Sequence, residues 1–240
     1  MNKLTVVAYI HTDFKSKFGI PRQSGLVEGL LGRIVFTPPY RNVEALRGLD
    51  GYSHIWLLWD FSQAHTEGEG WRPTVRPPRL GGNKRMGVWA TRSPFRPNHI
   101  GLSSVRISRI IPDSPQGPVI EVEGADLMDG TPIYDIKPYL PFTDCHPDAR
   151  GGFAEVQNQS LKPLDVEWLP LSAVTMDAPT KAVVSKLLAA DPRPHYQHDA
   201  HRIYAMEYGE WTIRFRVEAG TLIVVDGERN YSAISLPDHK

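Results

Sequence analysis

Cysteine is almost absent from this chain, and that absence limits the possible folds. The 240 residues include a single cysteine, Cys145, so no disulfide can form within the chain. A small disulfide-stapled secreted fold is therefore excluded, and we expect a reducing compartment, the cytoplasm. Hydrophobic residues make up 41% of the chain and charged residues 22%, as is usual for a globular protein whose core is held by packing alone.

Long apolar runs are also lacking. The run at residues 55–59 is far shorter than the roughly 20 apolar residues that a membrane helix needs. The apolar stretch at residues 4–10 is too short and too quickly interrupted for a secretory signal, so we interpret it as a first strand. We predict a protein that does not associate with membranes.

Acidic residues are missing from one long window. The formal net charge is zero, yet no Asp or Glu occurs between Gly70 and Pro112. The window holds nine cations: Arg72, Arg76, Arg79, Lys84, Arg85, Arg92, Arg96, Arg106 and Arg109. A surface built from such a window attracts a phosphate backbone. We favour a nucleic-acid partner over a merely solvated loop.

Several motifs of cofactor binding and catalysis are absent as well. The sequence has no Gly-x-Gly-x-x-Gly after a strand, no Gly-Lys-Ser/Thr phosphate loop and no nucleophile elbow. His195, His198 and His201 have a spacing that resembles metal ligands, but no cysteine or second cluster accompanies them. Zinc sites usually bring ligands from separate segments, so we predict no metal site.

The first 140 residues favour a barrel or a sandwich. Short segments rich in Val, Ile, Tyr and Trp alternate with Gly and Pro turns and have no long helix between them. The expected strands are residues 5–11, 32–36, 54–61, 86–91, 102–111, 119–122 and 132–140. Asn42 is a candidate cap for a short helix at 43–47, which Gly48 would end.

The C-terminal part predicts a helix followed by a meander. Asp177 is a candidate N-cap, Pro179 comes early in the helix, and an apolar stripe includes Val184 and Leu188. Strands are expected at 202–208, 211–218 and 221–226. The fold class is therefore mainly β / α+β. We expect a single-sheet β-barrel at residues 1–145, a linker at 146–172 and a small α+β domain at 173–240.

Two loops in the acid-free window have features of anion recognition. Prolines on both sides of Phe95 and Arg96 stiffen the loop at residues 91–102 and give its arginines a set orientation, which suits phosphate or carboxylate. The segment at 71–80 reads as a polyproline-like ribbon that carries Arg72, Arg76 and Arg79, and Trp71 offers a surface on which a base can stack. Both loops can also be simple solvated connections.

Asp129-Gly130 predicts a turn that leads into a strand. Alternation along that strand would place Ile133, Asp135, Lys137 and Tyr139 on one face. Asp135 and Lys137 are then either a surface pair or part of a polar stripe that faces a ligand.

The chain resembles the TsaA-like family of TrmO-type tRNA methyltransferases at residues 21–23, 51–56, 71–82, 91–102 and 129–141. The resemblance runs from residue 19 to residue 142 and resumes at 191–196, which is similar to the family's C-terminal signature. It implies a small β-barrel that binds S-adenosyl-L-methionine and a homodimer with the cofactor near the subunit interface. The implied reaction is N6-methylation of threonylcarbamoyladenosine at position 37, in the tRNA anticodon loop.

Site residues can be carried over motif by motif. The resemblance implies donor contacts from Pro21, Arg22, Gln23, Gln63, Arg92, Leu102, Asp129, Gly130, Thr131 and Pro132. We expect tRNA contacts from Arg72, Arg76, Arg79, Arg85 and Arg96. The chain departs from the family at Ser62-Gln63, where His-Gln is common and His65 follows nearby, and at His99, which replaces a usual proline and should loosen its loop.

The catalytic residue stays open at this point. Methyl transfer from a sulfonium is an in-line displacement, and a urea-like acceptor nitrogen must lose its proton. Asp135, a deprotonated Tyr139 or the substrate's own carboxylate are candidate bases, and the arginines of the 92–96 loop would bind that carboxylate. The alternatives are a noncatalytic RNA-binding β-barrel module and a donor-dependent enzyme that acts on a small anionic metabolite.

Overall fold

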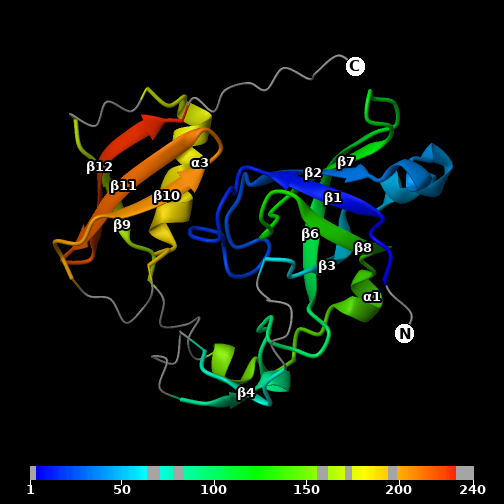
Figure 1. Ribbon diagram of the computed structural model, residues 1–240, viewed down its shortest axis with the longest axis horizontal. Helices are drawn as coiled ribbons and strands as arrows, with labels where there is room; N and C mark the ends of the chain where they lie inside the picture. The colour runs from blue at the N-terminus through cyan, green and yellow to red at the C-terminus, as the bar shows by residue number, and fades with distance from the viewer. Residues whose placement is uncertain are drawn as a thin grey trace.

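A computed structural model describes residues 4–63, 71–77, 84–155, 162–170, 175–193 and 199–230. It shows two β-rich bodies side by side, a barrel formed by the N-terminal part and a sheet covered by one helix formed by the C-terminal part (Figure 1). None of the helices in these residues has the length and apolar character needed to cross a membrane.

Six strands close into a barrel in the order β1-β2-β7-β6-β3-β8, and every neighbouring pair is antiparallel. The strands are β1 (Ala8–Thr12), β2 (Leu31–Phe36), β3 (His54–Asp60), β6 (Ile100–Ile111), β7 (Val119–Glu123) and β8 (Thr131–Pro138). Because the barrel is closed, each of its six strands pairs with a neighbour on both sides, and the barrel has no edge strand. The predicted barrel is confirmed.

Alternating side chains fill the barrel. Strand β3 has a buried residue at every second position, and Ile55 and Leu57 from it are fully buried with Ile10, Ile34 and Ile133. Each fully buried aliphatic side chain contributes about 1.5–3 kcal/mol of transfer free energy. This apolar core gives the strand ends a rigid base.

A bulge in β8 changes which side chains face the core. Leu58 pairs with Asp135 while Trp59 pairs with Ile133, so Tyr134 is an extra residue on β8. The extra residue shifts the alternation by one. Ile133 and Ile136 therefore pack in the barrel core, and Asp135 pairs with Lys137 at 2.9 Å with its side chain half exposed. The prediction of one shared face for Ile133, Asp135 and Lys137 is wrong.

The connections contain short elements. Asn42 caps the 3-10 helix η2 (Val43–Leu46) by accepting a hydrogen bond from the Glu44 N–H, and Gly48 follows with a φ of 82°, as predicted. Two further 3-10 helices, η1 (Pro38–Tyr40) and η3 (Leu49–Gly51), flank it, and α1 (Pro141–Asp144) follows β8.

The strand expected at 86–91 is much shorter in the structure. Only β5 (Met86–Gly87) forms, pairing with β4 (Thr74–Val75), and the 3-10 helix η5 (Val88–Ala90) replaces the rest. The Thr91 hydroxyl donates to the Val88 carbonyl at 2.8 Å, which closes this turn. The β4–β5 pair lies below the barrel in Figure 1.

The C-terminal sheet has the order β10-β11-β12-β9, from strands β9 (Asp165–Trp168), β10 (Tyr204–Tyr208), β11 (Trp211–Glu218) and β12 (Thr221–Arg229). Helix α3 (Ala178–Ala189) begins after Asp177, whose carboxylate accepts from the Thr180 N–H as expected of an N-cap. Strand β9 was not expected; it has four residues, and none of them is fully buried. It lies inside the range predicted as a linker and pairs in parallel with β12.

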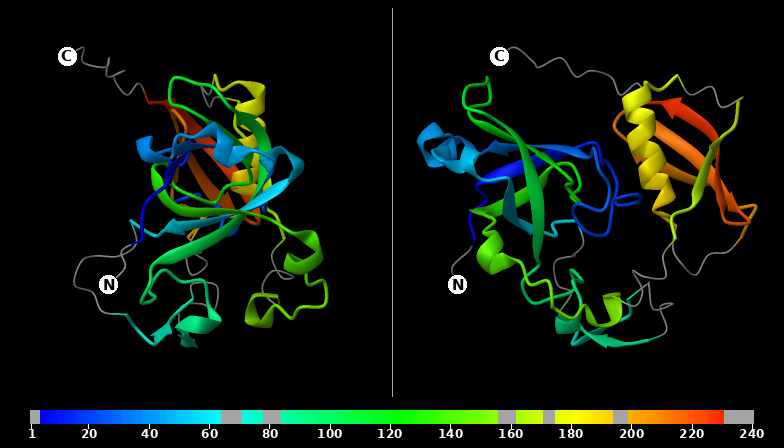
Figure 2. Two further views of the ribbon diagram at one scale, coloured as in Figure 1. Left: turned by 90° about the vertical axis from the view of Figure 1, so that its right-hand side faces the viewer. Right: turned by 180° about the vertical axis from the view of Figure 1, so that it is seen from behind.

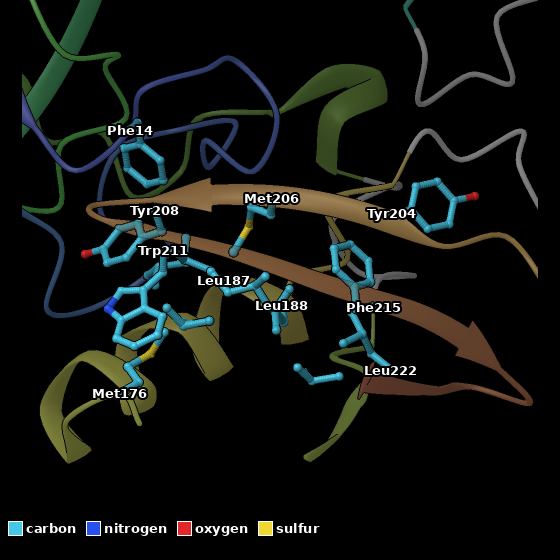
Figure 3. Close-up of a cluster of buried hydrophobic side chains, with 14 of the residues drawn as sticks. Phe14, Met176, Leu187, Leu188, Tyr204, Met206, Tyr208, Trp211, Phe215 and Leu222 are labelled. Atoms are coloured by element: carbon cyan, nitrogen blue, oxygen red, sulfur yellow. The ribbon is translucent and has the colours of Figure 1, made fainter. Parts of the chain in front are cut away.

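The two bodies share a hydrophobic core (Figure 3). Phe14, Val27 and Leu30, which precede β2, are buried in the same cluster as residues of α3 and of β10–β12. The right view of Figure 2, like Figure 1, shows α3 and its sheet next to the barrel. The segment between β1 and β2 is therefore built into the C-terminal domain.

Candidate functional site

A cavity of about 520 Å³ lies at one end of the barrel. The end of β3, the beginning of β6 and the beginning of β8 meet there, because Asp60 pairs with Ile100 and Trp59 with Ile133. Segments 17–23, 61–63, 91–96 and 126–128 complete its wall. Its lining residues are Lys17, Ile20, Pro21, Arg22, Gln23, Trp59, Asp60, Phe61, Ser62, Gln63, Thr91, Arg92, Pro94, Arg96, Ile100, Gly101, Leu102, Asp126, Leu127, Met128 and Thr131.

A chain of hydrogen bonds connects the cavity's aromatic wall to a carboxylate. The Trp59 indole N–H donates to the Ser103 hydroxyl at 3.0 Å, and that hydroxyl donates to Asp126 at 2.6 Å. Phe61 packs against Trp59 with ring centroids 4.2 Å apart. This network gives the Asp126 carboxylate one orientation in the cavity wall.

The cavity contains two acidic side chains, and their surroundings differ. Burial raises the pKa of the Asp126 carboxyl, because the hydrogen bond from Ser103 and the charge of Arg92 offset the lost solvation only in part. At Asp60, the carboxylate accepts a hydrogen bond from the hydroxyl of Tyr134, the bulged residue of β8, and burial together with this charge raises the pKa of that phenol. A carboxylate with a raised pKa is suited to take a proton near neutral pH.

The loop at 91–96 is held by its own arginine. The Arg96 guanidinium donates to the Thr91 carbonyl at 2.7 Å and lies 5.2 Å from the centre of the Trp89 ring. His99 donates from its ring to the Pro94 carbonyl at 2.8 Å, so this histidine fastens the loop and does not loosen it as expected. Arg92, in contrast, is exposed and donates to the Gln23 side-chain oxygen.

A larger groove, about 1470 Å³, opens next to the cavity. The two share Arg22, Gln23, Thr91, Arg92 and Pro94, so they are continuous. Arg72, Arg76 and Arg85 line the groove with Trp89 and Phe95, and none of its described lining residues is acidic. Trp89 is 66% exposed and lies 6.1 Å, ring centre to ring centre, from Trp71.

The structure gathers most, but not all, of the residues predicted to contact a donor. Seven of them line the cavity: Pro21, Arg22, Gln23, Gln63, Arg92, Leu102 and Thr131. Asp129, Gly130 and Pro132 do not. The Asp129 carboxylate accepts a hydrogen bond from the Thr12 N–H at 3.2 Å and pairs with Lys15 at 2.8 Å and with His11 at 3.2 Å. Gly130 forms the turn with a φ of 75°.

Of the arginines predicted to contact tRNA, Arg72, Arg76 and Arg85 line the groove and Arg96 lines the cavity. Arg79 lies outside the described residues, as do His65, His195 and His198, and His201 is exposed. The described residues contain no group of three His, Cys, Asp or Glu able to hold a metal.

Neither predicted side-chain base is among the residues that line the cavity. Asp135 pairs with Lys137, and Tyr139 packs against Trp56 with ring centroids 5.5 Å apart. Sequence reasoning missed Asp126, Asp60 and Trp59. A single acid between apolar neighbours, as in Ala125-Asp126-Leu127, is the one local signal that could have indicated Asp126.

Comparison with known proteins gives consistent matches along the chain. The model of the tRNA-methyltransferase O N-terminal domain matches residues 9–145, and that of the TrmO C-terminal domain matches residues 162–230. A tRNA (adenine(37)-N6)-methyltransferase of Escherichia coli strain K12 is 41% identical over 217 residues, 88% of this chain and 91% of the relative. One of Eikenella corrodens is 47% identical over 174 residues, 72% of this chain and 95% of the relative.

The fold of the chain is also similar to that of a solved structure. A crystal structure of TrmO from Pseudomonas aeruginosa superposes with a TM-score of 0.75 at 31% identity and covers 95% of this chain and 99% of its own. Two family domains, relatives matched over most of their length and a shared two-domain fold agree. The chain belongs to the tRNA-methyltransferase O family.

Proposed function

We propose that this protein is a cytoplasmic S-adenosyl-L-methionine-dependent methyltransferase that methylates N6 of threonylcarbamoyladenosine at position 37 of tRNA. The observation that carries the proposal is the continuity of an aromatic-walled cavity with an acid-free groove through Arg22, Gln23 and Arg92. The names of the relatives, which specify adenine 37 of tRNA, support it. The resemblance to the TsaA-like family supports the modified adenosine as the substrate.

The cavity fits the proposed donor in size and chemistry. Its 520 Å³ lies within the range of about 300–1,000 Å³ found for small-molecule sites. Trp59, Phe61 and Leu102 offer apolar surface for the adenine and the methionine chain, and Gln23 and Arg92 offer polar groups. S-adenosylmethionine, when bound, supplies a methyl group on a positively charged sulfur.

The residues of the site have separate roles in this proposal. Asp126, oriented by Ser103, accepts the proton of the acceptor nitrogen. Arg92 lines both the cavity and the groove, so it is placed to bind the carboxylate of the threonylcarbamoyl group. Arg96 supports Arg92 indirectly, since it holds the loop by its bond to the Thr91 carbonyl.

The groove is the proposed site for the anticodon loop. Single-stranded RNA loops are bound by cations along the backbone and by aromatic surfaces that stack on splayed bases. Arg72 and Arg76 offer the charge, and the exposed Trp89 offers the surface. An unpaired loop, unlike a duplex, can place its base in the neighbouring cavity.

We also propose that two copies form a homodimer, as the family resemblance implies. Leu102 supports this, because it lines the cavity and is still 48% exposed, so a second copy placed next to the cavity would cover this apolar side chain. Light scattering on the purified protein tests the proposal. A dimer is expected at micromolar concentration, and a monomer would rule it out.

The activity test combines two measurements. Purified protein is incubated with S-adenosylmethionine and tRNA that carries threonylcarbamoyladenosine, and the nucleosides are analysed by mass spectrometry. A modified nucleoside heavier by one methyl group is expected, and tRNA without the modification serves as the control. Calorimetry with the donor alone separates the enzyme from a noncatalytic RNA-binding barrel, for which no donor binding is expected.

A further inference from the structure

The segment between β1 and β2 supplies one wall of the cavity, but it has no regular secondary structure. Residues 13–30 contain no helix or strand, and Gly19, Gly25 and Gly29 adopt positive φ angles. Residues 20–23 of this segment line the cavity. A chain without a helical or sheet ladder depends on tertiary contacts for its shape.

The C-terminal domain supplies many of these contacts. Phe14, Val27 and Leu30 are at most 4% exposed, and they are buried in the core formed by α3 and β10–β12. Phe18 and Ile20 pack against the same core. In Figure 3, Phe14 lies above Tyr208, and the centroids of these two rings are 5.5 Å apart.

Before the cavity residues, the contacts are close and specific. A β-carbon at Gly19 would lie 2.5 Å from the sulfur of Met206, so the backbone at Gly19 rests directly on that side chain. The Gly209 N–H donates to the Asp13 carbonyl at 2.7 Å. Tyr208 is hydrogen-bonded to the Asp13 side chain, and burial with this bond strongly raises the pKa of the phenol.

After the cavity residues, helix α3 provides the contacts. A β-carbon at Gly29 would lie 3.0 Å from a methyl group of Val183, and Lys186 pairs with Glu28 at 2.9 Å. The cavity residues 20–23 are thus flanked on both sides by points at which the segment rests on the second domain.

We infer that the C-terminal domain positions the donor-contacting segment, with Met206 beneath Gly19 as the central positioning residue. This inference rests on the proposed function, because it assigns the domain a role in donor binding. The domain acts through packing, and none of its residues that the structure describes lines the cavity or the groove. Loss of the support leaves residues 20–23 able to move, and a bound donor must then order them, which weakens its affinity.

The test uses Met206→Ala in the full chain, with Leu222→Ala as the matched control. Leu222 is fully buried in the same core and lies at its opposite end from Phe14 (Figure 3). Both changes should lower the melting temperature, because both leave a cavity. At a temperature where each variant is folded, Met206→Ala should raise the dissociation constant of S-adenosylmethionine by about tenfold or more, and Leu222→Ala should leave it near the wild-type value.

Two further variants separate positioning from general destabilisation. Met206→Leu, a nearly volume-conserving change, should restore donor affinity. Tyr208→Phe removes only a hydroxyl, so it should fold and still weaken donor binding by severalfold through the lost bond to Asp13. It serves as the test if Met206→Ala does not fold. With saturating donor, both Met206→Ala and Tyr208→Phe should recover most of kcat and retain the KM for tRNA.

The possible failures can be told apart. If the wild-type protein binds no donor, the proposed function fails. If the wild-type protein binds donor and Met206→Ala and Tyr208→Phe bind it equally well, the positioning role fails and the function stands. Equal weakening by Leu222→Ala would also overturn the inference, since the effect would then reflect core stability alone.

Discussion

The indole ring of Trp59 lies directly against the backbone of Gly101 in the neighbouring strand. A β-carbon at residue 101 would be 2.3 Å from the ring, closer than any real contact allows. The missing side chain therefore makes room for the aromatic wall of the cavity. The same ring orients Ser103, and through it Asp126.

Gly101→Ala should displace that wall. The Trp59 ring cannot move away without displacing Phe61 and Ser103, which it contacts. We therefore expect a loss of about 1–3 kcal/mol in the free energy of unfolding and weaker donor binding. Chemical denaturation and calorimetry measure the two effects. Gly51→Ala is the control, because a β-carbon there meets nothing within 4 Å. Unchanged donor affinity in Gly101→Ala would contradict the role of Trp59 in the cavity.

Asp126→Asn should make the protein more stable and less active. Because the folded-state pKa of Asp126 is raised, the native state holds this proton more tightly than the unfolded state does, and stability falls as pH rises from the usual carboxyl pKa to the raised value. The neutral amide avoids that loss, so the melting temperature at pH 7 should increase and its pH dependence should flatten.

The same variant should lose activity by about 100-fold or more if Asp126 takes the acceptor's proton. Turnover with saturating donor and tRNA is the measurement. Asp60→Asn is the comparison, since Asp60 is the other acid in the cavity lining. A larger loss in Asp60→Asn than in Asp126→Asn would move the assignment to Asp60.

Arg76→Ala should weaken tRNA binding at low salt without affecting donor binding. Arg76 is exposed in the groove, so its loss should make the slope of log affinity against log salt shallower by about one. Arg109→Ala is the matched control from the same acid-free window, because Arg109 pairs with Glu121 at 2.9 Å. The affinity for tRNA is measured at several salt concentrations. An equal change of the slope in both variants would argue against the groove as the tRNA site.

Asp129→Asn should lower the free energy of unfolding at neutral pH more than at acidic pH. Burial raises the pKa of the Asp129 carboxyl, but the bonds from Lys15 and Thr12 outweigh it, so the pKa is lowered overall. The stability from this carboxylate is present above its usual pKa and is lost as pH falls through the lowered value. We expect a loss of about 1–2 kcal/mol at pH 7 and almost none at strongly acidic pH. Urea titrations at both pH values check this.

The residue pattern along the chain determined the fold class and several local structures. Short strands rich in Val, Ile, Tyr and Trp, with no long helix between them, favoured a barrel or a sandwich, and the structure shows the barrel. Asp177 and Asn42 cap their helices as their side-chain chemistry indicates. These features depend on near neighbours in the chain, so the sequence carries them directly. The acid-free window likewise indicated the groove, because its charge is a property of composition.

The site depended on contacts between distant segments. The bulge at Tyr134 turned Asp135 away from the barrel core, although alternation alone had placed it with Ile133. Asp126 became a candidate base only because barrel closure brought it to Ser103 and Trp59. The support of Gly19 by Met206 joins residues of two domains. Strand register and domain packing arise from the whole fold, so no local pattern contains them.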